Sequence, residues 1–289
     1  DYQLPGFRRD GGNADMKKIG SKIYLFLCFL FLYAPILVLI IFSFNQSKNR
    51  ANFTGFTLKW YRDLFQNELI MTSLRNTIVV AIISSLVATV IGTIAAIGIS
   101  GMKKRAKGIV MNITYLPVIN PEIITGVSTM LLLVLICNTI TQLAASIFGV
   151  QLKLELGMWS VLISHITFCL PYIILNVLPK LRQMDPHLYE AAIDLGCSPV
   201  QAFFKVVIPE IMPGILSGCL MAFTFSLDDF IITYFTSGSS FQTLPVTIYS
   251  MTRMKINPQI NALSAIMFVV VLVLLLLTNV SPSKRTKRI

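Results

Sequence analysis

Residues 77–100 read TIVVAIISSLVATVIGTIAAIGIS and contain no Asp, Glu, Lys or Arg. A helix of about 20 apolar residues is long enough to cross the hydrocarbon core of a bilayer. Ala88, Gly92 and Ala96 recur at every fourth position, a spacing at which small residues let two membrane helices approach closely. The stretch therefore predicts a membrane-spanning helix that packs on another helix, either of the same subunit, which we favour, or of a second membrane subunit.

Five further apolar stretches have the length of a membrane span, at residues 23–44, 109–136, 157–178, 213–235 and 260–280. Backbone groups cannot stay unpaired in lipid, and the stretches lack the alternation of a β-strand, so we expect helices. Gly214 and Gly218 repeat the small-residue spacing in the fifth stretch. The sequence thus predicts an all-α, polytopic membrane protein with about six transmembrane helices.

The composition agrees with lipid as the main solvent. The 289 residues are 55% hydrophobic and 13% charged, whereas about a quarter of the residues are charged in soluble domains. The formal net charge of +11 would suit nucleic acid only on a folded basic face outside the membrane, and we see no stretch that could form one. With both termini inside, 16 of the 24 Lys and Arg residues lie on the inner side. The positive-inside rule then predicts a multi-pass protein of the inner or plasma membrane with cytoplasmic termini.

The N-terminal residues look different from the rest of the chain. Residues 1–15 are polar, and Met16 followed by Lys17 and Lys18 resembles a natural start. We expect residues 1–15 to be a leader or a non-native extension, and residues 16–289 to form a single transmembrane domain. The five Cys residues have no metal-ligand spacing, so no metal site is expected.

Residues 182–212, RQMDPHLYEAAIDLGCSPVQAFFKVVIPEIM, form a loop between the fourth and fifth spans. Asp185 and Pro186 predict a helix start, Gly196 predicts its end, and Ser198 with Pro199 predicts a second short helix that ends at Pro209. The two helices would expose more apolar surface than solvated helices need. The residues concerned are Leu188, Tyr189, Ala191, Ala192, Leu195, Phe203 and Phe204. A protein partner is therefore expected to cover part of this cytoplasmic loop.

The same loop resembles the EAA loop of ABC importer permeases, whose pattern is EAA-xxx-G-x9-I-x-L-P. Glu190, Ala191, Ala192, Gly196 and Pro209 match the pattern, while Val206 and Ile208 replace its Ile and Leu by other apolar residues. Four segments widen the resemblance to spermidine/putrescine permeases of the PotC type: SHITFCLPY (164–172), EAAIDLG, FSLDDFIITYF (225–235) and LPVTIYSM (244–251).

The resemblance implies a type I ABC importer permease-like fold that forms half of a translocation pore. It implies four kinds of partner: a second related permease, two ATPase subunits, an external polyamine-binding protein and the lipid bilayer. Coupling to the ATPase would fall to the EAA residues with Phe203, although Glu190 could instead be a solvated acid in the first turn of a helix. The chain lacks the G-x-x-x-x-G-K-[ST] motif, so we expect no enzyme activity and no cofactor here, with ATP and Mg bound by the partner ATPases.

Ionisable residues at membrane depth are costly and normally face a cavity or a partner. Asp228 and Asp229 fall in the outer half of the fifth predicted span, and Glu122 after Pro121 falls near the middle of the third. Successive helical residues diverge by about 100°, so we expect only one of the two Asp residues to face a cation pathway and the other to cap backbone, meet a neighbouring subunit or be protonated. Pro121 frees a backbone carbonyl and predicts a kink in this span, with irregular backbone at a lined cavity. Glu122 could line the pathway, or it could bond Ser or Thr within a closed bundle.

Aromatic faces also bind ammonium groups, so Phe225, Tyr234 and Tyr249 join the predicted substrate pathway, with ordinary packing as the alternative. His165 has no carboxylate at ligand spacing, and we expect it to be a buried hydrogen-bonding residue instead of a proton relay or metal ligand. The alternatives to a polyamine importer permease are a permease of the same superfamily for another small solute and, less favoured, a proton-driven secondary cation transporter. A secondary transporter should show an internal repeat, and we see no convincing one.

Overall fold

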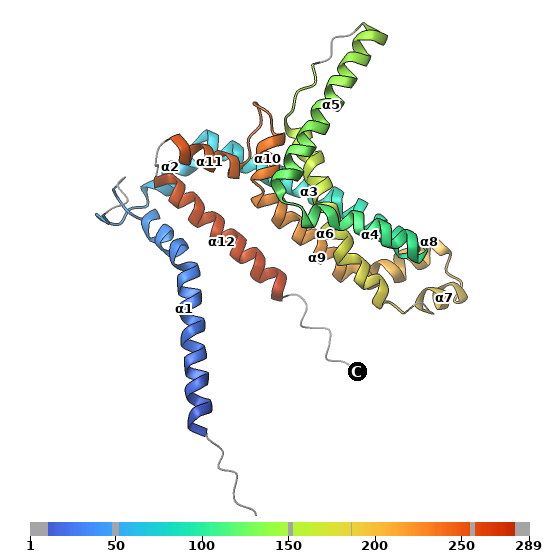
Figure 1. The fold of residues 1–289 in the computed structure, drawn as a ribbon, viewed down its shortest axis with the longest axis horizontal. Coiled ribbons are helices and arrows are strands. Elements are labelled where there is room, and N and C mark those ends of the chain that lie inside the picture. Colours follow the sequence, from blue (N-terminus) through green and yellow to red (C-terminus); the bar gives the residue numbers. More distant parts are fainter. Residues whose placement is uncertain (1–10, 48–51, 150–152, 186, 255–257, 281–289) are drawn as a thin grey trace, which may run out of the picture. The chain divides into compact units, whose positions relative to one another are not determined.

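The structure is a computed structural model that describes residues 11–47, 52–149, 153–185, 187–254 and 258–280. Within these ranges helices joined by loops make up the chain, with one isolated antiparallel bridge between Asn45 and Phe56 and no extended strand (Figure 1). This confirms the predicted all-α class. Most of the predicted leader, residues 1–10, lies outside the described residues. The chain divides into two compact units, so the single transmembrane domain stays a prediction.

The first unit comprises described residues within 1–64 and 256–270. It contains α1 (Gly11–Ser43), α2 (Lys59–Phe65) and the first part of α12 (Pro258–Val280). The indole Nε1 of Trp60 donates to the carbonyl oxygen of Asn45 at 2.7 Å, and the hydroxyls of Ser43 and Tyr61 lie 2.7 Å apart. These bonds fasten α2 to the turn that follows α1.

The second unit comprises described residues within 65–255 and from 271 onward. Its long helices are α3 (Glu68–Ser100), α4 (Lys104–Ile119), α5 (Glu122–Phe148), α6 (Met158–Gln183) and α9 (Ile208–Asp228). Its short elements are α7 (His187–Asp194), α8 (Pro199–Ala202), the π-helical turn η1 (Phe203–Val207), α10 (Ile231–Thr236) and α11 (Leu244–Met254).

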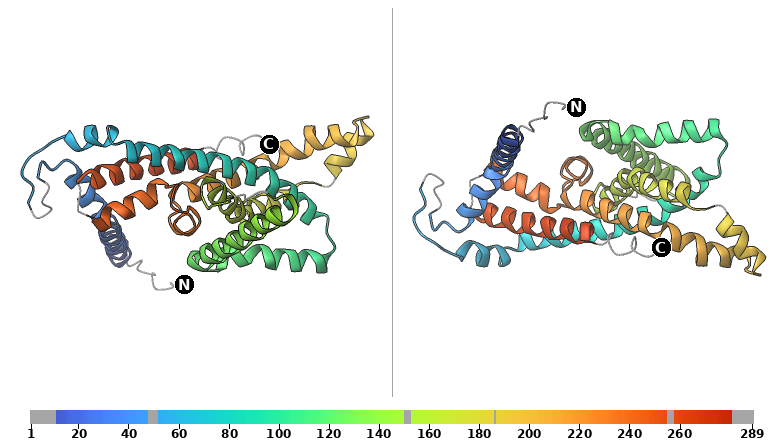
Figure 2. Two further views of the ribbon diagram at one scale, coloured as in Figure 1. Left: turned by 90° about the horizontal axis from the view of Figure 1, so that it is seen from above. Right: turned by 90° about the horizontal axis from the view of Figure 1, so that it is seen from below.

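The core of the second unit lies where α3, α6 and α9 pack together (Figure 2). A Cβ atom on Gly92 of α3 would lie 2.7 Å from Cβ of Ile173 on α6. On α9, a Cβ atom on Gly214 would lie 2.8 Å from the carbonyl oxygen of Asn176, and one on Gly218 would lie 3.2 Å from Cα of Ile173. Both predicted small-residue stripes therefore serve packing inside the subunit, against α6.

Gly92→Ala is expected to lower stability by about 1–3 kcal/mol, because the added methyl group overpacks the contact with Ile173. A Cβ atom on Gly98 of the same helix would meet no neighbouring element within 4 Å, so Gly98→Ala is the matched control. The control should be neutral or stabilising by up to about 1 kcal/mol, since Ala favours helix over Gly. Thermal unfolding of the two variants in detergent measures the difference. Equal stabilities would contradict the close approach of α3 and α6.

Five helical runs within the described residues are long and apolar enough to span a membrane. They are Gly20–Ser43, Glu68–Ser100, Glu122–Ile147, Met158–Gln183 and Pro199–Asp228. The predicted sixth span lies in α12, whose described apolar stretch, Pro258–Val273, is shorter. The count of six spans therefore stays a prediction.

The predicted third span, 109–136, is wrong as one continuous helix. α4 ends at Ile119, Asn120 is extended with ψ of 142°, and α5 begins at Glu122. The proline ring disfavours helical backbone in the residue before it, so Pro121 interrupts the helix instead of kinking it. Glu122 consequently lies in the first turn of α5 and not in the interior of a span.

The predicted fifth span, 213–235, is wrong at both ends. α9 ends at Asp228, Asp229 is extended with ψ of 124°, and α10 begins at Ile231. Upstream, α8 continues through η1 into α9, so Pro209 does not end the second short helix as predicted but lies in the first turn of α9. Proline has no N–H to donate, so this continuous helix lacks one backbone hydrogen bond at Pro209, just after the π-helical turn η1.

Candidate functional site

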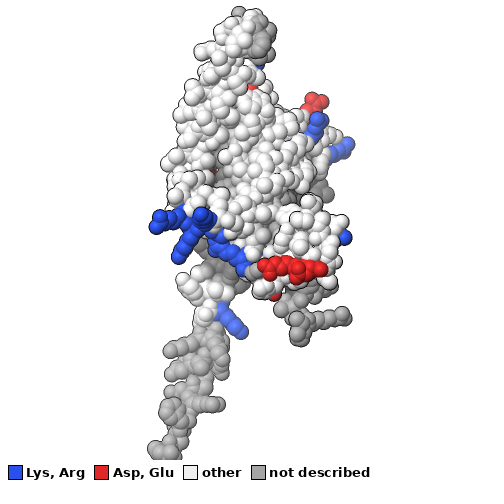
Figure 3. Space-filling view, turned by 90° about the vertical axis from the view of Figure 1, so that its right-hand side faces the viewer, with Lys and Arg blue, Asp and Glu red and all other residues white. Residues whose placement is uncertain are grey.

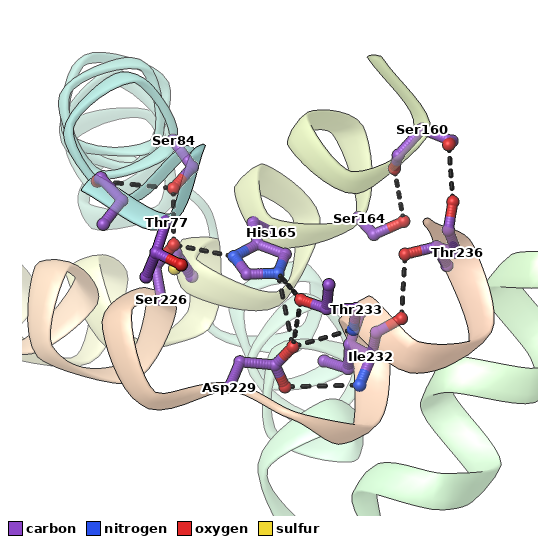
Figure 4. A network of polar contacts seen from close by, with 12 residues as sticks. Thr77, Ser84, Ser160, Ser164, His165, Ser226, Asp229, Ile232, Thr233 and Thr236 are labelled. Atoms are coloured by element: carbon purple, nitrogen blue, oxygen red, sulfur yellow. Dashed lines mark hydrogen bonds and ion pairs between the residues drawn. The ribbon is translucent and has the colours of Figure 1, made fainter. Parts of the chain in front are cut away.

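The break between α9 and α10 is built around the carboxylate of Asp229, whose side chain is 4% exposed. Its Oδ1 accepts the backbone N–H of Ile232 at 3.3 Å, and its Oδ2 accepts the backbone N–H of Thr233 at 2.8 Å (Figure 4). The hydroxyl of Thr233 also donates to Oδ2, at 2.8 Å. Because the first amides of a helix have no partner within it, Asp229 caps α10. Capping is one of the roles predicted for the Asp residue that does not face the pathway.

His165 of α6 contacts the same carboxylate. Its Nε2 lies 2.9 Å from the Thr233 hydroxyl and 3.3 Å from Oδ2 of Asp229, and its side chain is 1% exposed. The predicted buried hydrogen-bonding role is therefore confirmed. The carboxylate partner was not predicted, because it lies on another helix far along the chain.

The network continues from His165 across two more helices. Its Nδ1 lies 2.7 Å from the hydroxyl of Ser226 on α9, which lies 2.9 Å from the hydroxyl of Ser84 on α3. A carboxylate only accepts hydrogen bonds, so the proton of a neutral His165 must be on Nε2, facing Asp229. Nδ1 then accepts from Ser226, and a single chain of hydrogen bonds links α3, α9, α6 and the start of α10.

A separate contact fastens the other end of α10 to α6. The hydroxyl of Ser160 donates to the carbonyl oxygen of Thr236 at 2.6 Å, and the hydroxyl of Ser164 donates to the carbonyl oxygen of Ser160 at 2.7 Å. Both ends of α10 are thus held against α6 by buried polar groups (Figure 4).

Asp228, one residue before the cap, has the opposite environment. It is exposed, as is Glu122 in the first turn of α5. The start of α5 packs on α10, with Gly126, one turn after Glu122, against the backbone of Ile231 and Ile232, so the two carboxylates lie at neighbouring helix ends. The structure therefore brings together two predicted pathway residues that are distant in sequence, while it buries the third, Asp229. Two neighbouring exposed carboxylates create a negative electrostatic potential that attracts a cation.

Aromatic rings line the same region. The ring of Phe225 lies 4.5 Å from that of Tyr172 on α6, which lies 5.4 Å from Phe168. Tyr172 and Phe225 are partly exposed, and Tyr172 lies within electrostatic range of Glu122. Tyr172 was not predicted as a pathway residue, although the SHITFCLPY segment that carries the resemblance contains it.

Tyr234 and Tyr249 form a second aromatic cluster around Phe230, with ring centroids 5.4 Å and 4.7 Å from that ring. The guanidinium of Arg253 lies 5.3 Å from the ring centroid of Tyr249. This face of Tyr249 is thus already occupied by a cation of the chain itself. The pathway role of Tyr234 and Tyr249 stays a prediction.

A cavity of about 240 Å³ lies elsewhere, between α5, residues 154–156 and residues 238–239. Its carboxylate, Glu155, has Oε1 2.7 Å from Nζ of Lys153, and this hydrogen-bonded ion pair holds the pKa of Glu155 below its usual value. Since the negative charge is already paired, this cavity is a weaker cation site than the Glu122 and Asp228 pair.

The predicted start and end of the first loop helix are confirmed. Oδ1 of Asp185 accepts the N–H of His187 at 3.0 Å, and Gly196 adopts a left-handed conformation with φ of 87° after α7 ends. Pro186, the predicted first helical position, lies outside the described residues. Glu190 is exposed, with Oε2 3.3 Å from Nδ1 of His187 one turn away.

The second loop helix starts at Ser198 as predicted. Its hydroxyl accepts the N–H of Gln201 at 3.3 Å, while Oε1 of Gln201 accepts the N–H of Ser198 at 3.2 Å, which is a capping box. Within the loop Ala192 is buried, Ala191 is exposed and Phe203 is half-buried against the ring of Phe204. The coupling role of these residues is not tested by their positions and stays a prediction.

Exposed apolar side chains gather on this loop. Leu195 is 87% exposed, Val200 67% and Phe204 62%. Figure 3 shows the side of the molecule that carries α4, α7 and α8, where basic side chains gather on one flank and acidic side chains lie beside them. Large exposed apolar residues among charged ones are typical of a protein-binding surface.

Comparison with known proteins was made at the level of family, sequence and structure. The family model described as "Binding-protein-dependent transport system inner membrane component" matches residues 88–285. The chain is 34% identical over 259 residues to the spermidine/putrescine transport system permease protein PotC of Escherichia coli strain K12, covering 90% of this chain and 92% of the relative. It is 38% identical over 246 residues to the putrescine transport system permease protein PotI of the same strain, covering 84% of each.

Solved structures agree on the fold. A bacterial ABC transporter that imports the acidic polysaccharide alginate matches 95% of this chain and 98% of its own, with a TM-score of 0.70 and 20% identity. An amino acid ABC transporter matches 78% of this chain and 97% of its own, with a TM-score of 0.53 and 18% identity. These similarities support the importer permease fold and carry no information about the substrate.

Proposed function

This chain belongs to the family of binding-protein-dependent transport system inner membrane components, and we propose that it is the membrane-spanning permease subunit of an ATP-driven importer for polyamines. Its relatives of similar length are named as spermidine/putrescine and putrescine permeases. The single observation in this chain that carries the substrate class is the exposed pair of carboxylates, Glu122 and Asp228, beside the rings of Tyr172 and Phe225.

The chemistry of that site suits a flexible chain of ammonium groups. Each ammonium can pair with a carboxylate, and an aromatic face adds about 0.5–2 kcal/mol of cation–π attraction. An anionic solute would instead meet two like charges, at a cost in free energy. The site therefore favours a cationic solute over an anionic one.

The chain forms half of a pore and needs partners to work. A second related permease completes the pore, two ATPase subunits bind ATP and Mg, and an external binding protein delivers the polyamine. An alginate transporter with this fold has been solved in complex with a ligand-bound periplasmic protein, which supports the last of these. The chain itself carries no ATPase motif, so its part is alternating access and not catalysis.

The loop from α7 to α9 is the contact with the ATPase in this proposal. Its exposed apolar residues and Glu190 enter a cleft on that subunit, and closure of the ATPases moves the attached helices. The loop is then cytoplasmic, as are both termini of this multi-pass chain.

Uptake of spermidine into vesicles tests the proposal. The chain is reconstituted into vesicles with the candidate second permease, ATPase and binding protein. Uptake of labelled spermidine is then measured with and without ATP on the side of the membrane where the ATPase subunits are bound. We expect uptake that requires ATP and all partners. Uptake by this chain alone under a proton gradient would contradict the importer and support a secondary transporter, while ATP-driven uptake of another solute in preference to polyamines would contradict the substrate class.

A further inference from the structure

Asp228 is the last residue of α9, so the position of its side chain follows from what holds that end of the helix in place. In a continuous helix the next turn would fix it. Here the helical repeat stops at Asp228 and Asp229 is extended, so the groups around the break hold the end of α9, among them His165 through its contact with Ser226 in the last turn. The holding groups are the two backbone amides at the start of α10, the Thr233 hydroxyl and the imidazole of His165.

His165 differs from the other groups because it comes from outside the α9–α10 segment. The amides and the hydroxyl belong to residues 232 and 233, so they move together with Asp229. His165 belongs to α6, on which both α3 and α9 are packed through glycine contacts. Its side chain is 1% exposed, so water cannot easily replace it when it is removed.

Ser160 of α6 forms a second hydrogen bond with α10, to the carbonyl oxygen of Thr236. That bond holds the far end of α10 on α6 through groups that do not include His165. Loss of the imidazole therefore leaves the far end of α10 bonded to α6 and removes the side-chain contact between α6 and Asp229. The main consequence falls on Asp228 and its distance from Glu122.

We propose that His165 is a positioning residue for the cation site: by fastening Asp229 and Thr233 to α6, its imidazole keeps the Asp228 carboxylate exposed beside Glu122. This inference rests on the proposed function. It assigns to His165 no contact with the polyamine and no transfer of a proton.

The test compares three variants in the complete reconstituted transporter, with ATP-driven spermidine uptake measured over a range of concentrations. His165→Phe keeps a planar side chain but removes both ring nitrogens, whereas His165→Gln retains a donor that can reach the position of Nε2. Thr167→Val on the same helix removes a hydroxyl that donates within its own helix, to the carbonyl oxygen of Ile163, and serves as the control. We expect His165→Phe to raise the apparent KM about tenfold with a smaller change in maximal rate. His165→Gln should restore most of the affinity, and Thr167→Val should match the unmodified protein.

If His165→Phe does not assemble, Thr233→Val tests the positioning role instead. Thr233→Val keeps the volume of a fully buried side chain but removes the hydroxyl that bridges Nε2 and Asp229, and it should raise the apparent KM about threefold or more. Hydrogen exchange of residues 229–236 should speed up in both variants, because the amides held by Asp229 open more often.

Two results would overturn the inference. One is an unchanged KM in assembled His165→Phe or, failing that, in Thr233→Val. The other is a loss of maximal rate that His165→Gln does not restore. Asp228→Asn measured in parallel separates this failure from that of the proposed function. A defect in Asp228→Asn with normal His165 variants removes only the positioning role, whereas normal transport by Asp228→Asn removes the cation pathway itself.

Discussion

Asp228→Asn is expected to lower ATP-driven spermidine uptake by about 10- to 100-fold while the transporter still assembles. An ammonium group about 4 Å from a carboxylate gains about 4 kcal/mol at the effective dielectric of a protein surface, and part of this is recovered by the neighbouring Glu122. Assembly should be preserved for two reasons. The amide has nearly the same shape as the carboxylate, and Asp228 is exposed and does not cap α10.

Uptake at a low spermidine concentration, compared between membranes with equal amounts of assembled complex, measures this effect. Glu155→Gln is the matched control, since it removes an exposed carboxylate that already pairs with Lys153. The control should transport normally. Unchanged uptake in Asp228→Asn would remove this carboxylate from the pathway.

Glu190→Ala is expected to reduce the spermidine transported per ATP hydrolysed by at least about tenfold. Truncating one partner of a buried interfacial charge pair costs about 2–5 kcal/mol, and Glu190 is exposed in the isolated chain and therefore accessible to such a partner. Since the ATP sites lie on the partner, hydrolysis continues while its connection to the membrane helices weakens.

Simultaneous measurement of ATP hydrolysis and spermidine uptake in proteoliposomes gives the number of spermidine molecules transported per ATP hydrolysed. Asp194→Ala is the control, because Asp194 is another exposed acid of the same short helix. A normal ratio in Glu190→Ala would show that this acid is only a solvated residue of the first turn.

Local signals in the sequence predict the loop between the fourth and fifth spans well. Asp185, Gly196 and Ser198 act within two to four residues of themselves, through caps and a left-handed turn. Such effects depend on side-chain chemistry that can be read without knowing the fold.

The two helix breaks are harder to predict because hydrophobicity continues across them. The sequence pattern at Pro121 predicts a kinked span, whereas the residue separates α4 from α5. The carboxylate at the second break contacts His165, which lies 64 positions before Asp229 in the chain and on a different helix. Glu122 and Asp228 lie at the two breaks, so only the list of acidic residues could be predicted and not their separate roles.

The small and hydroxylated face of α3 also bears on how the chain folds. The hydroxyl of Thr77 donates to the carbonyl oxygen of Ser73 at 2.8 Å and accepts the N–H of Leu244 at 2.7 Å, 167 residues later in the chain. The hydroxyl of Ser84 lies 3.4 Å from the carbonyl oxygen of Ala81 in its own turn and 2.9 Å from the hydroxyl of Ser226, 142 residues later. A hydroxyl donates once and accepts twice, so Thr77 keeps its first bond when it accepts the second. Ser226 donates its proton to His165, so Ser84 must move its own proton from Ala81 to Ser226.

During synthesis, therefore, α3 can stay inserted in the bilayer while the hydroxyls of Thr77 and Ser84 donate to backbone carbonyls of the same helix. The bonds to Ser226 and Leu244 form only when α9 and α11 have been made, so they come after the synthesis of α3 and α6. A ribosome-bound chain that stops before α9 should hold α3 inserted and able to pack on α6, but without its hydroxyl bonds to α9 and α11.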